Sequence, residues 1–158
     1  MEFSDKYLCG GYNPVMADGK IPGKILAVDW GSKRIGLAIS DETQTLARPL
    51  HVLEHISRAE DARRVIEAAD QDGASLIIVG VTYSDENELS PSGRSAQRLA
   101  AEIEMQASIK LILWDEEFST NVMKETMILT GSPRSKRSGH SDDKAAAIIL
   151  QSYLDSNK

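Results

Sequence analysis

The sequence is poor in features that stabilise or localise many small proteins. Cys9 is the only cysteine in 158 residues, so neither an internal disulfide nor a cysteine-rich zinc site can form. The absence of a disulfide framework fits a reducing compartment, and we expect a cytoplasmic protein. No apolar run reaches the roughly 20 residues that a membrane helix needs. The N-terminus also lacks the cationic start and apolar stretch of a secretory signal, so no membrane association is expected.

The sequence also lacks an excess of positive charge. It has 18 Lys and Arg against 24 Asp and Glu, a formal net charge of −6. Proteins that coat nucleic acid without specificity usually carry net positive charge, so this class is disfavoured. An enzyme that cuts nucleic acid is not excluded, because an acidic site can lie beside a local basic patch. The length fits one domain with a substantial core.

The most informative stretch runs from Lys24 to Asp41. An apolar run, Ile25 to Val28, brings Asp29 to a tight turn that contains glycine, and a second apolar run, Ile35 to Ile39, carries the chain back. This pattern predicts an antiparallel hairpin with an acid at a strand end, where a metal ion or a phosphate can reach it. A purely structural alternative is that Asp29 hydrogen-bonds the turn it precedes.

The remaining chain alternates strands and helices. Residues 1–22 are rich in Gly and Pro and are expected to form a flexible leader before one domain, 23–158. Ser57 and Glu60 have the spacing of a capping box, and Gly73 is a plausible helix end. The other expected strands are 46–53, 75–80 and 109–114, and the other expected helices are 92–106, 120–129 and 142–154.

This order predicts an α/β domain with a mixed five-stranded sheet. Three antiparallel strands come first, parallel strands follow with right-handed crossovers, and helices cover the sheet. In open sheets of this kind, functional sites form beyond the carboxyl ends of the strands. That rule selects the acids that deserve consideration as site residues.

Three groups of acids fall at such positions. Asp29 ends the first strand, Asp115 and Glu116 end the last strand, and Asp142 opens the final helix. If the first and last parallel strands lie side by side, these acids meet at one edge of the sheet. Carboxylate oxygens suit Mg²⁺ or Mn²⁺, and two such ions can drive phosphodiester hydrolysis. The structural alternatives are that Asp142 caps its helix and that Asp115 caps the following turn.

The same residues resemble a known family. The segments that match are D-W-G-S-K-R-I-G-L-A-I-S-D from Asp29, A-R-P-L from Ala47, L-I-I-V-G from Leu76, D-E-E-F-S-T from Asp115, and D-D-K-A-A-A-I-I-L-Q-S-Y-L from Asp142. Together they are similar to the YqgF-type, Holliday-junction-resolvase-like proteins, also described as pre-16S rRNA nucleases. The resemblance covers Lys24 to Leu154.

The resemblance implies an RNase H-like fold and helices on both faces of the sheet. It also implies a metal-dependent nuclease that processes the 5′ end of pre-16S rRNA during ribosome biogenesis; some members are instead linked to resolving branched DNA. The catalytic and metal-binding acids of the family fall on Asp29, Glu116 and Asp142. Glu116 is preferred to Asp115 because it holds the second acidic position of the family motif.

Two departures from the family pattern bear on activity. The family usually has Arg after the Asp-Glu pair, whereas this chain has Glu117. The family also commonly has Pro in the segment after the buried strand, where this chain has Thr82. These departures motivate an alternative, a non-catalytic module that keeps the fold and binds nucleic acid.

Several cations flank the predicted acidic site. They are Lys33 and Arg34 in the first turn, and Arg134, Lys136 and Arg137 in the loop before the final helix. A cationic rim of this kind would hold nucleic acid despite the negative total charge. A solvated, mobile loop is the structural alternative. Trp30 could either stack on a base or pack against the sheet.

Three further questions stay open at this point. An Asp-x-Gly hairpin also opens the folds of actin and sugar kinases, but those need two such domains to enclose ATP. No base-reading residue is identifiable, so the sequence does not choose between RNA and DNA. Exposed apolar surface on the helices would permit a homodimer, which composition alone does not show.

Overall fold

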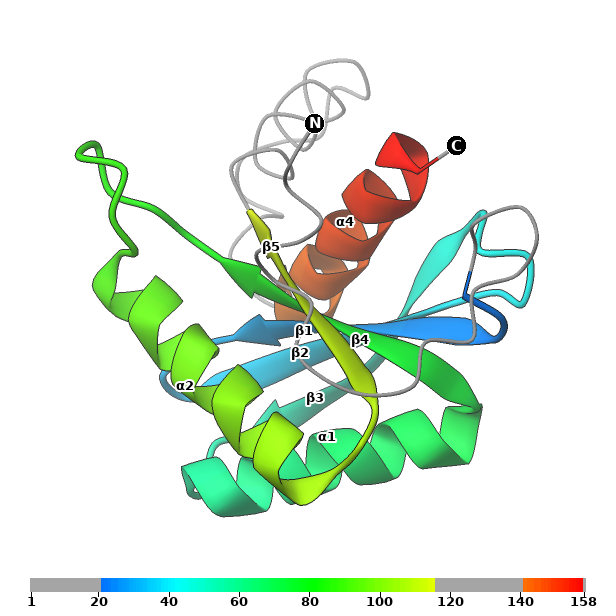
Figure 1. Cartoon of the computed structure of the whole chain (residues 1–158), viewed down its shortest axis with the longest axis horizontal. Helices are drawn as coiled ribbons and strands as arrows, with labels where there is room; N and C mark the ends of the chain where they lie inside the picture. The colour runs from blue at the N-terminus through cyan, green and yellow to red at the C-terminus, as the bar shows by residue number, and fades with distance from the viewer. Residues whose placement is uncertain (1–20, 116–140, 158) are drawn as a thin grey trace.

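The computed structural model of the protein describes residues 21–115 and 141–157, which form a sheet with helices packed on it (Figure 1). The strands are β1 (Lys24–Trp30), β2 (Arg34–Ser40), β3 (Ala47–Glu54), β4 (Ala74–Val81) and β5 (Lys110–Asp115). The helices within the described residues are α1 (Arg58–Asp72), α2 (Pro91–Gln106) and α4 (Ser141–Ser156). The helix predicted over 120–129 and the loop predicted before Asp142 lie outside these residues.

The five strands form one mixed sheet in the order β3-β2-β1-β4-β5. The pairs β1–β2 and β2–β3 are antiparallel, whereas β1–β4 and β4–β5 are parallel. The predicted antiparallel strands followed by parallel strands are therefore confirmed. The first and last parallel strands do not lie side by side, however, and that expectation is wrong. β4 lies between them, because a strand buried from Leu76 to Val81 needs neighbours on both edges and cover on both faces.

Helices cover both faces of the sheet, as predicted. Successive side chains of a strand point to opposite faces, so each strand contributes to two cores. On the first face, which we call the α1/α2 face, the sheet packs against α1 and α2 through Leu26, Val28, Ile35, Leu37, Ile77, Val79, Val81 and Leu111. On the second, the α4 face, it packs against α4 through Ile25, Ala27, Ala38, Leu76 and Ile78. None of the helices in the described ranges combines the length and apolarity needed to span a bilayer.

The ends of α1 follow the signals in the sequence. The Ser57 side chain accepts a hydrogen bond from the backbone N–H of Glu60 at 3.2 Å. The helix ends at Gly73, whose φ of 72° is left-handed and whose N–H bonds the carbonyls of Ala69 and Asp70. Glycine adopts this conformation without the steric cost that other residues meet. The predicted start and end of this helix are confirmed.

A buried carboxylate joins the end of β3 to the first turn of α1. The side chain of Asp61 is 1% exposed. It accepts hydrogen bonds from the backbone N–H of Ile56 at 3.1 Å and from the Arg64 guanidinium at 2.7 Å, and it contacts Nδ1 of His55. Arg64 also donates to the carbonyl of Glu54 at 2.5 Å. A buried charge is tolerated when it is paired and hydrogen-bonded in this way.

These contacts give Asp61 a defined effect on stability. Burial opposes ionisation, but the hydrogen bonds from Ile56, His55 and Arg64 outweigh it and hold the pKa of Asp61 below its ordinary value of 3.8. A lowered pKa means that the carboxylate stabilises the fold at pH values above 3.8. That contribution is lost as the pH falls through the pKa of the folded state.

We therefore predict that Asp61→Asn lowers the free energy of unfolding at neutral pH by roughly 3–5 kcal/mol, because it breaks a buried charged network. The loss of stability on acidification should also be shallower in the variant. Urea unfolding at a series of pH values measures both effects. Asp70→Asn, at an exposed position of the same helix, is the matched control and should change stability by less than about 0.5 kcal/mol. Equal effects of the two variants would contradict the prediction.

Candidate active site

Asp29 stands near the carboxyl end of β1, half-buried and on the α4 face. Its cross-strand partner on β2 is Gly36. On β4 the position level with it is Gly80, which follows the pair Val28–Val79. Side chains level with one another on neighbouring strands share a face. Because both positions are glycine, no side chain stands level with the carboxylate on β2 or on β4.

The last strand brings a second acid to the same edge but to the other face. In β5, Trp114 pairs with Gly80 and lies on the α4 face, whereas Asp115 pairs with Val81, which belongs to the core under α1 and α2. Alternation therefore directs Asp115 to the α1/α2 face, opposite Asp29. β1 and β5 end at the same edge of the sheet, but Asp115 and Asp29 point to opposite faces, so these two acids do not converge. Glu116 lies outside the described residues.

Helix α4 runs in the direction opposite to β1 and covers the face that carries Asp29 (Figure 1). Near its end, Gln151 accepts a hydrogen bond from the N–H of Ala47 at 2.9 Å and donates to the carbonyl of Thr45 at 3.0 Å. These contacts hold that part of the helix at the start of β3, the edge remote from Asp29. The backbone of Asp142 belongs to the first turn of α4, roughly 13 Å back along the helix axis at 1.5 Å per residue. The start of α4 therefore lies toward the carboxyl end of β1.

Aromatic contacts attach α4 to the end of β5. The rings of Trp114 and Tyr153 meet edge to face with centroids 5.2 Å apart, a favourable arrangement for aromatic pairs. The indole N–H of Trp114 donates to the hydroxyl of Ser152 at 3.4 Å. Burial raises the pKa of Tyr153, so its hydroxyl stays neutral. These contacts help to hold the helix over the face on which Asp29 stands.

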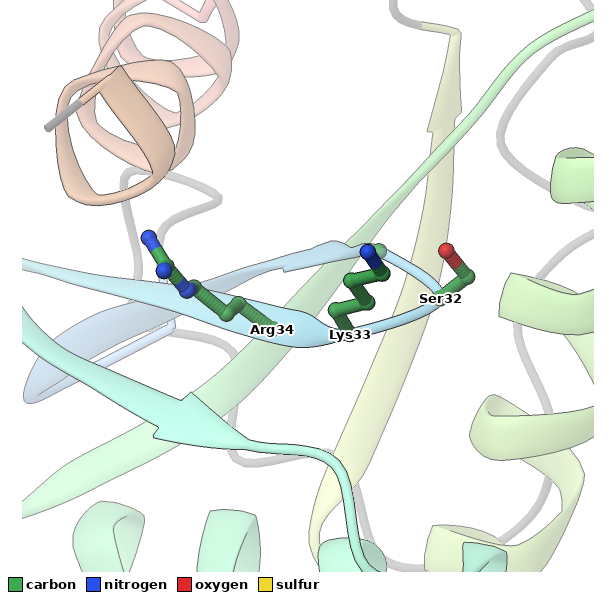
Figure 2. A pocket seen from close by; sticks show the side chains of 4 residues that line it. Ser32, Lys33 and Arg34 are labelled. Carbon is green, nitrogen blue, oxygen red and sulfur yellow. The ribbon is translucent and has the colours of Figure 1, made fainter. Parts of the chain in front are cut away.

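The turn between β1 and β2 is basic and open to solvent. Gly31, Ser32, Lys33 and Arg34 line an open pocket, and Figure 2 shows the three labelled side chains rising to the side of the hairpin on which α4 lies. Arg34 is two residues before Gly36, so it shares the face of Asp29. The carbonyl of Lys33 accepts a hydrogen bond from the next connection, after β3, at 2.9 Å. The structure thus brings the predicted cations Lys33 and Arg34 to the edge that carries Asp29.

Trp30 has a structural role. It lies on the α1/α2 face and packs against the core beneath α1 and α2, away from Asp29. Of the two roles considered for it, packing against the sheet is the one confirmed. Base stacking beside the acid does not fit its position.

Hydrogen bonds of hydroxyl groups hold the segment after β4, where Thr82 replaces the family's proline. The Ser90 hydroxyl caps α2 by accepting from the N–H of Gly93 at 3.0 Å, and it also contacts the hydroxyl of Thr82. The hydroxyls of Thr82 and Ser92 are 3.1 Å apart. A side chain at Gly93 would place its Cβ 2.3 Å from the carbonyl of Thr82. This close packing gives the segment a fixed course that needs no proline.

The described side chains supply one of the three predicted metal ligands. Within them, no group of three His, Cys, Asp or Glu side chains could hold a metal ion. Of the predicted set, only the side chain of Asp29 is described. Its carboxylate is a hard oxygen donor with glycine level with it on both neighbouring strands, and such a donor fits Mg²⁺ or Mn²⁺. Arg134, Lys136 and Arg137 lie outside the described residues.

Comparison with known proteins identifies the family. A family model described as RuvX, Holliday junction resolvase, matches residues 23–156. The chain belongs to this family. A relative from Thermoanaerobacter pseudethanolicus named "Putative pre-16S rRNA nuclease" is 35% identical over 136 residues, covering 85% of this chain and 98% of the relative. A relative of the same name from Desulforudis audaxviator is 31% identical over 135 residues, covering 85% of this chain and 96% of the relative.

A solved structure supports the fold. The chain superimposes on T. thermophilus RuvC, in a complex with a Holliday junction substrate, with a TM-score of 0.57 and 16% identity. The match covers 84% of this chain and 94% of that one. The RNase H-like fold implied by the sequence motifs is therefore confirmed.

The two glycines beside Asp29 are site features that the sequence motifs did not reveal. Gly36 lies inside the opening motif, and Gly80 lies next to the last residue of β4, Val81. Each is unremarkable in its local sequence. Their relation appears only when the registers of β1 with β2 and with β4 are known. The sequence did contain one indication of this arrangement. One buried strand has a glycine near its carboxyl end, and another strand has an acid near its own carboxyl end.

We predict that Gly31→Ala distorts the basic turn. Its Cβ would lie 2.5 Å from the carbonyl oxygen of Arg34, so the backbone of the hairpin would have to shift. The expected cost in the free energy of unfolding is about 1–3 kcal/mol, measured by urea denaturation. Ser32→Ala, in the same turn and exposed, should change stability by less than about 0.5 kcal/mol. A Gly31→Ala protein as stable as Ser32→Ala would contradict this account of the turn.

Proposed function

We propose that this protein is a metal-dependent nuclease that hydrolyses phosphodiester bonds of structured nucleic acid, with the 5′ end of pre-16S rRNA as its substrate. The single observation that carries the proposal is the position of Asp29. In a chain of this family, a half-buried acid stands between two glycines at the carboxyl edge of the sheet, with the start of α4 toward the same edge. The names of the relatives support pre-16S rRNA as the substrate.

We assign Asp29, Glu116 and Asp142 as the acids that hold Mg²⁺ or Mn²⁺. When bound, such ions supply an activated water and stabilise the leaving oxygen. Because Asp115 faces α1 and α2, it is a poor partner for Asp29, and Glu116 is the acid we choose from that part of the chain. In this proposal Asp29 provides the fixed carboxylate, held in orientation by the pairing of β1 on both sides.

The cations hold and orient the phosphodiester backbone. Lys33 and Arg34 extend from the turn next to Asp29 (Figure 2), and Arg134, Lys136 and Arg137 are proposed to complete the rim. Cationic side chains of this kind position a nucleic acid without reading its sequence. The reaction is placed in the cytoplasm, which suits a chain whose single cysteine precludes an internal disulfide.

Resolution of branched DNA is the second candidate. It is favoured by the family model, whose description is Holliday junction resolvase. The acids and cations assigned above would serve either substrate, since the chemistry is phosphodiester hydrolysis in both. Parallel cleavage assays on a pre-16S rRNA 5′ leader and on a four-way DNA junction decide between the two.

We predict that Asp29→Asn abolishes cleavage of the substrate that the wild type cuts, while the protein stays folded. Replacing a carboxylate by an amide removes the charge that the metal requires and preserves the shape of the side chain. Asp115→Asn is the matched control, because it changes the same group at the same edge on the opposite face. It should keep activity within about threefold, since it is not assigned to the metal. Full activity of Asp29→Asn, or equal losses in both variants, would overturn the assignment.

Metal removal gives an independent prediction. Chelation by EDTA should abolish cleavage, and Mn²⁺ or Mg²⁺ should restore it, because the proposed ligands are all carboxylates. Mn²⁺ should also raise the melting temperature of the wild type, since a ligand that binds the folded state stabilises it. The same ion should leave the melting temperature of Asp29→Asn unchanged. Cleavage that persists in EDTA would exclude the metal-dependent mechanism and, with it, the proposed function.

A further inference from the structure

The carboxyl edge of the sheet has unlike charges on the two sides of Asp29. The strand order places β2 and β3 on one side of β1, and β4 and β5 on the other. At this edge, the connections next to β2 and β3 carry positive charge, whereas the connection after β4 carries negative charge. Because Asp29 lies at this edge, the difference bears on how a polyanion would reach it.

The side of β2 and β3 is basic. Lys33 and Arg34 occupy the turn before β2, and Arg58 begins α1 directly after the connection from β3; all three are exposed. The two connections touch, because the N–H of His55 donates to the carbonyl of Lys33 at 2.9 Å. Two acids lie near these cations. Glu60, two residues after Arg58, forms an ion pair with Arg63 at 2.6 Å, and Glu54 is the cross-strand partner of Arg34. We call Lys33, Arg34 and Arg58 the basic side.

The side of β4 carries an acid-tipped hairpin. Residues 82–90, which we call the acidic arm, leave β4 and project beyond α2 in Figure 1. The arm contains three acids, Asp85, Glu86 and Glu88, all of them exposed, and no Lys or Arg. Its side chains therefore present only negative charge at this edge.

The acidic arm has a defined structure. Tyr83 pairs with Leu89 across it, and both side chains pack against the core beneath α1 and α2. The N–H of Ser84 donates to the carbonyl of Glu88 at 2.6 Å. At its base, the Arg94 guanidinium donates to the carbonyl of Leu89 at 2.9 Å. These contacts give the arm a defined course where it leaves the carboxyl end of β4, the strand next to β1.

We propose that the nucleic-acid backbone crosses this edge over the basic side, contacting Lys33 and Arg58, and that the acidic arm keeps it off the side of β4. The inference rests on the proposed function, because it concerns the path of the same substrate to Asp29. Attraction on one side and repulsion on the other fix the direction of approach, and rejection of wrong orientations is a common use of like charge. RNA and DNA share the phosphodiester backbone on which this depends.

The test measures binding separately from cleavage. Fluorescence anisotropy is recorded with a labelled pre-16S 5′-leader RNA and with a labelled four-way DNA junction, in EDTA and over a series of salt concentrations. Lys33→Ala and Arg58→Ala are compared with Arg48→Ala, an exposed cation at the opposite edge. The double variant Asp85→Asn/Glu86→Gln is compared with Glu42→Gln/Asp70→Asn, which changes the net charge equally at that opposite edge.

Removal of either cation should weaken binding and lower the slope of log affinity against log salt by about 1. Neutralising the arm should strengthen binding by about 1.5- to 2-fold, the size expected for two charges roughly 10 Å from one phosphate at about 0.1 M salt, and by more at lower salt. Both control variants should bind like the wild type.

The proposal is overturned if Arg48→Ala weakens binding as much as Arg58→Ala, or if the arm variant binds no better than its control. It is also overturned if the wild type binds neither probe. The variants of the basic side and of the arm could change binding in EDTA as predicted while the wild type never cleaves with Mn²⁺. That result would support the proposed path of the nucleic acid and contradict the proposed function. The two failures are therefore distinguishable.

Discussion

The pairing of β1 with β2 on one side and with β4 on the other is the interaction on which the site depends. It buries the stretch from Ile25 to Val28 and carries Asp29 just past the buried part, to the carboxyl edge. The register that directs Leu26 and Val28 into the core under α1 and α2 turns Asp29 toward α4. A slip of one residue would exchange the two faces. The packing that stabilises the core therefore also orients the acid.

The distribution of charge explains how a chain of net charge −6 can act on a polyanion. Exposed cations lie in the turn before β2 and just after β3, whereas three exposed acids lie on the arm after β4. Total charge is a weak guide when the charges at one edge are separated in this way. Buried charge has a different role, since the carboxylate of Asp61 is enclosed by hydrogen bonds and joins β3 to α1. Asp61 therefore differs in environment from the exposed acids of the arm.

Local sequence predicted the elements well and the relations between them less well. The hairpin, the Ser57 cap and the Gly73 end depend on residues that are close in the chain, so the sequence alone identified them. The place of β4 between β1 and β5 depends on long-range pairing, and local patterns do not encode it. The opposite faces of Asp29 and Asp115, and the pair Gly36 and Gly80, follow from that pairing. Family resemblance selected Glu116 over Asp115, and the alternation of β5 supplies a physical reason for that choice.

The most direct measurement is the anomalous scattering of Mn²⁺ in crystals of the wild-type protein soaked with that ion. The account predicts a peak at coordination distance, about 2.0–2.2 Å, from the carboxylate of Asp29 on the α4 face. It predicts that the peak is lost in Asp29→Asn crystals and kept in Asp115→Asn crystals. A peak bound by Asp115 on the opposite face, or no peak at Asp29 under saturating Mn²⁺, would contradict the central claim.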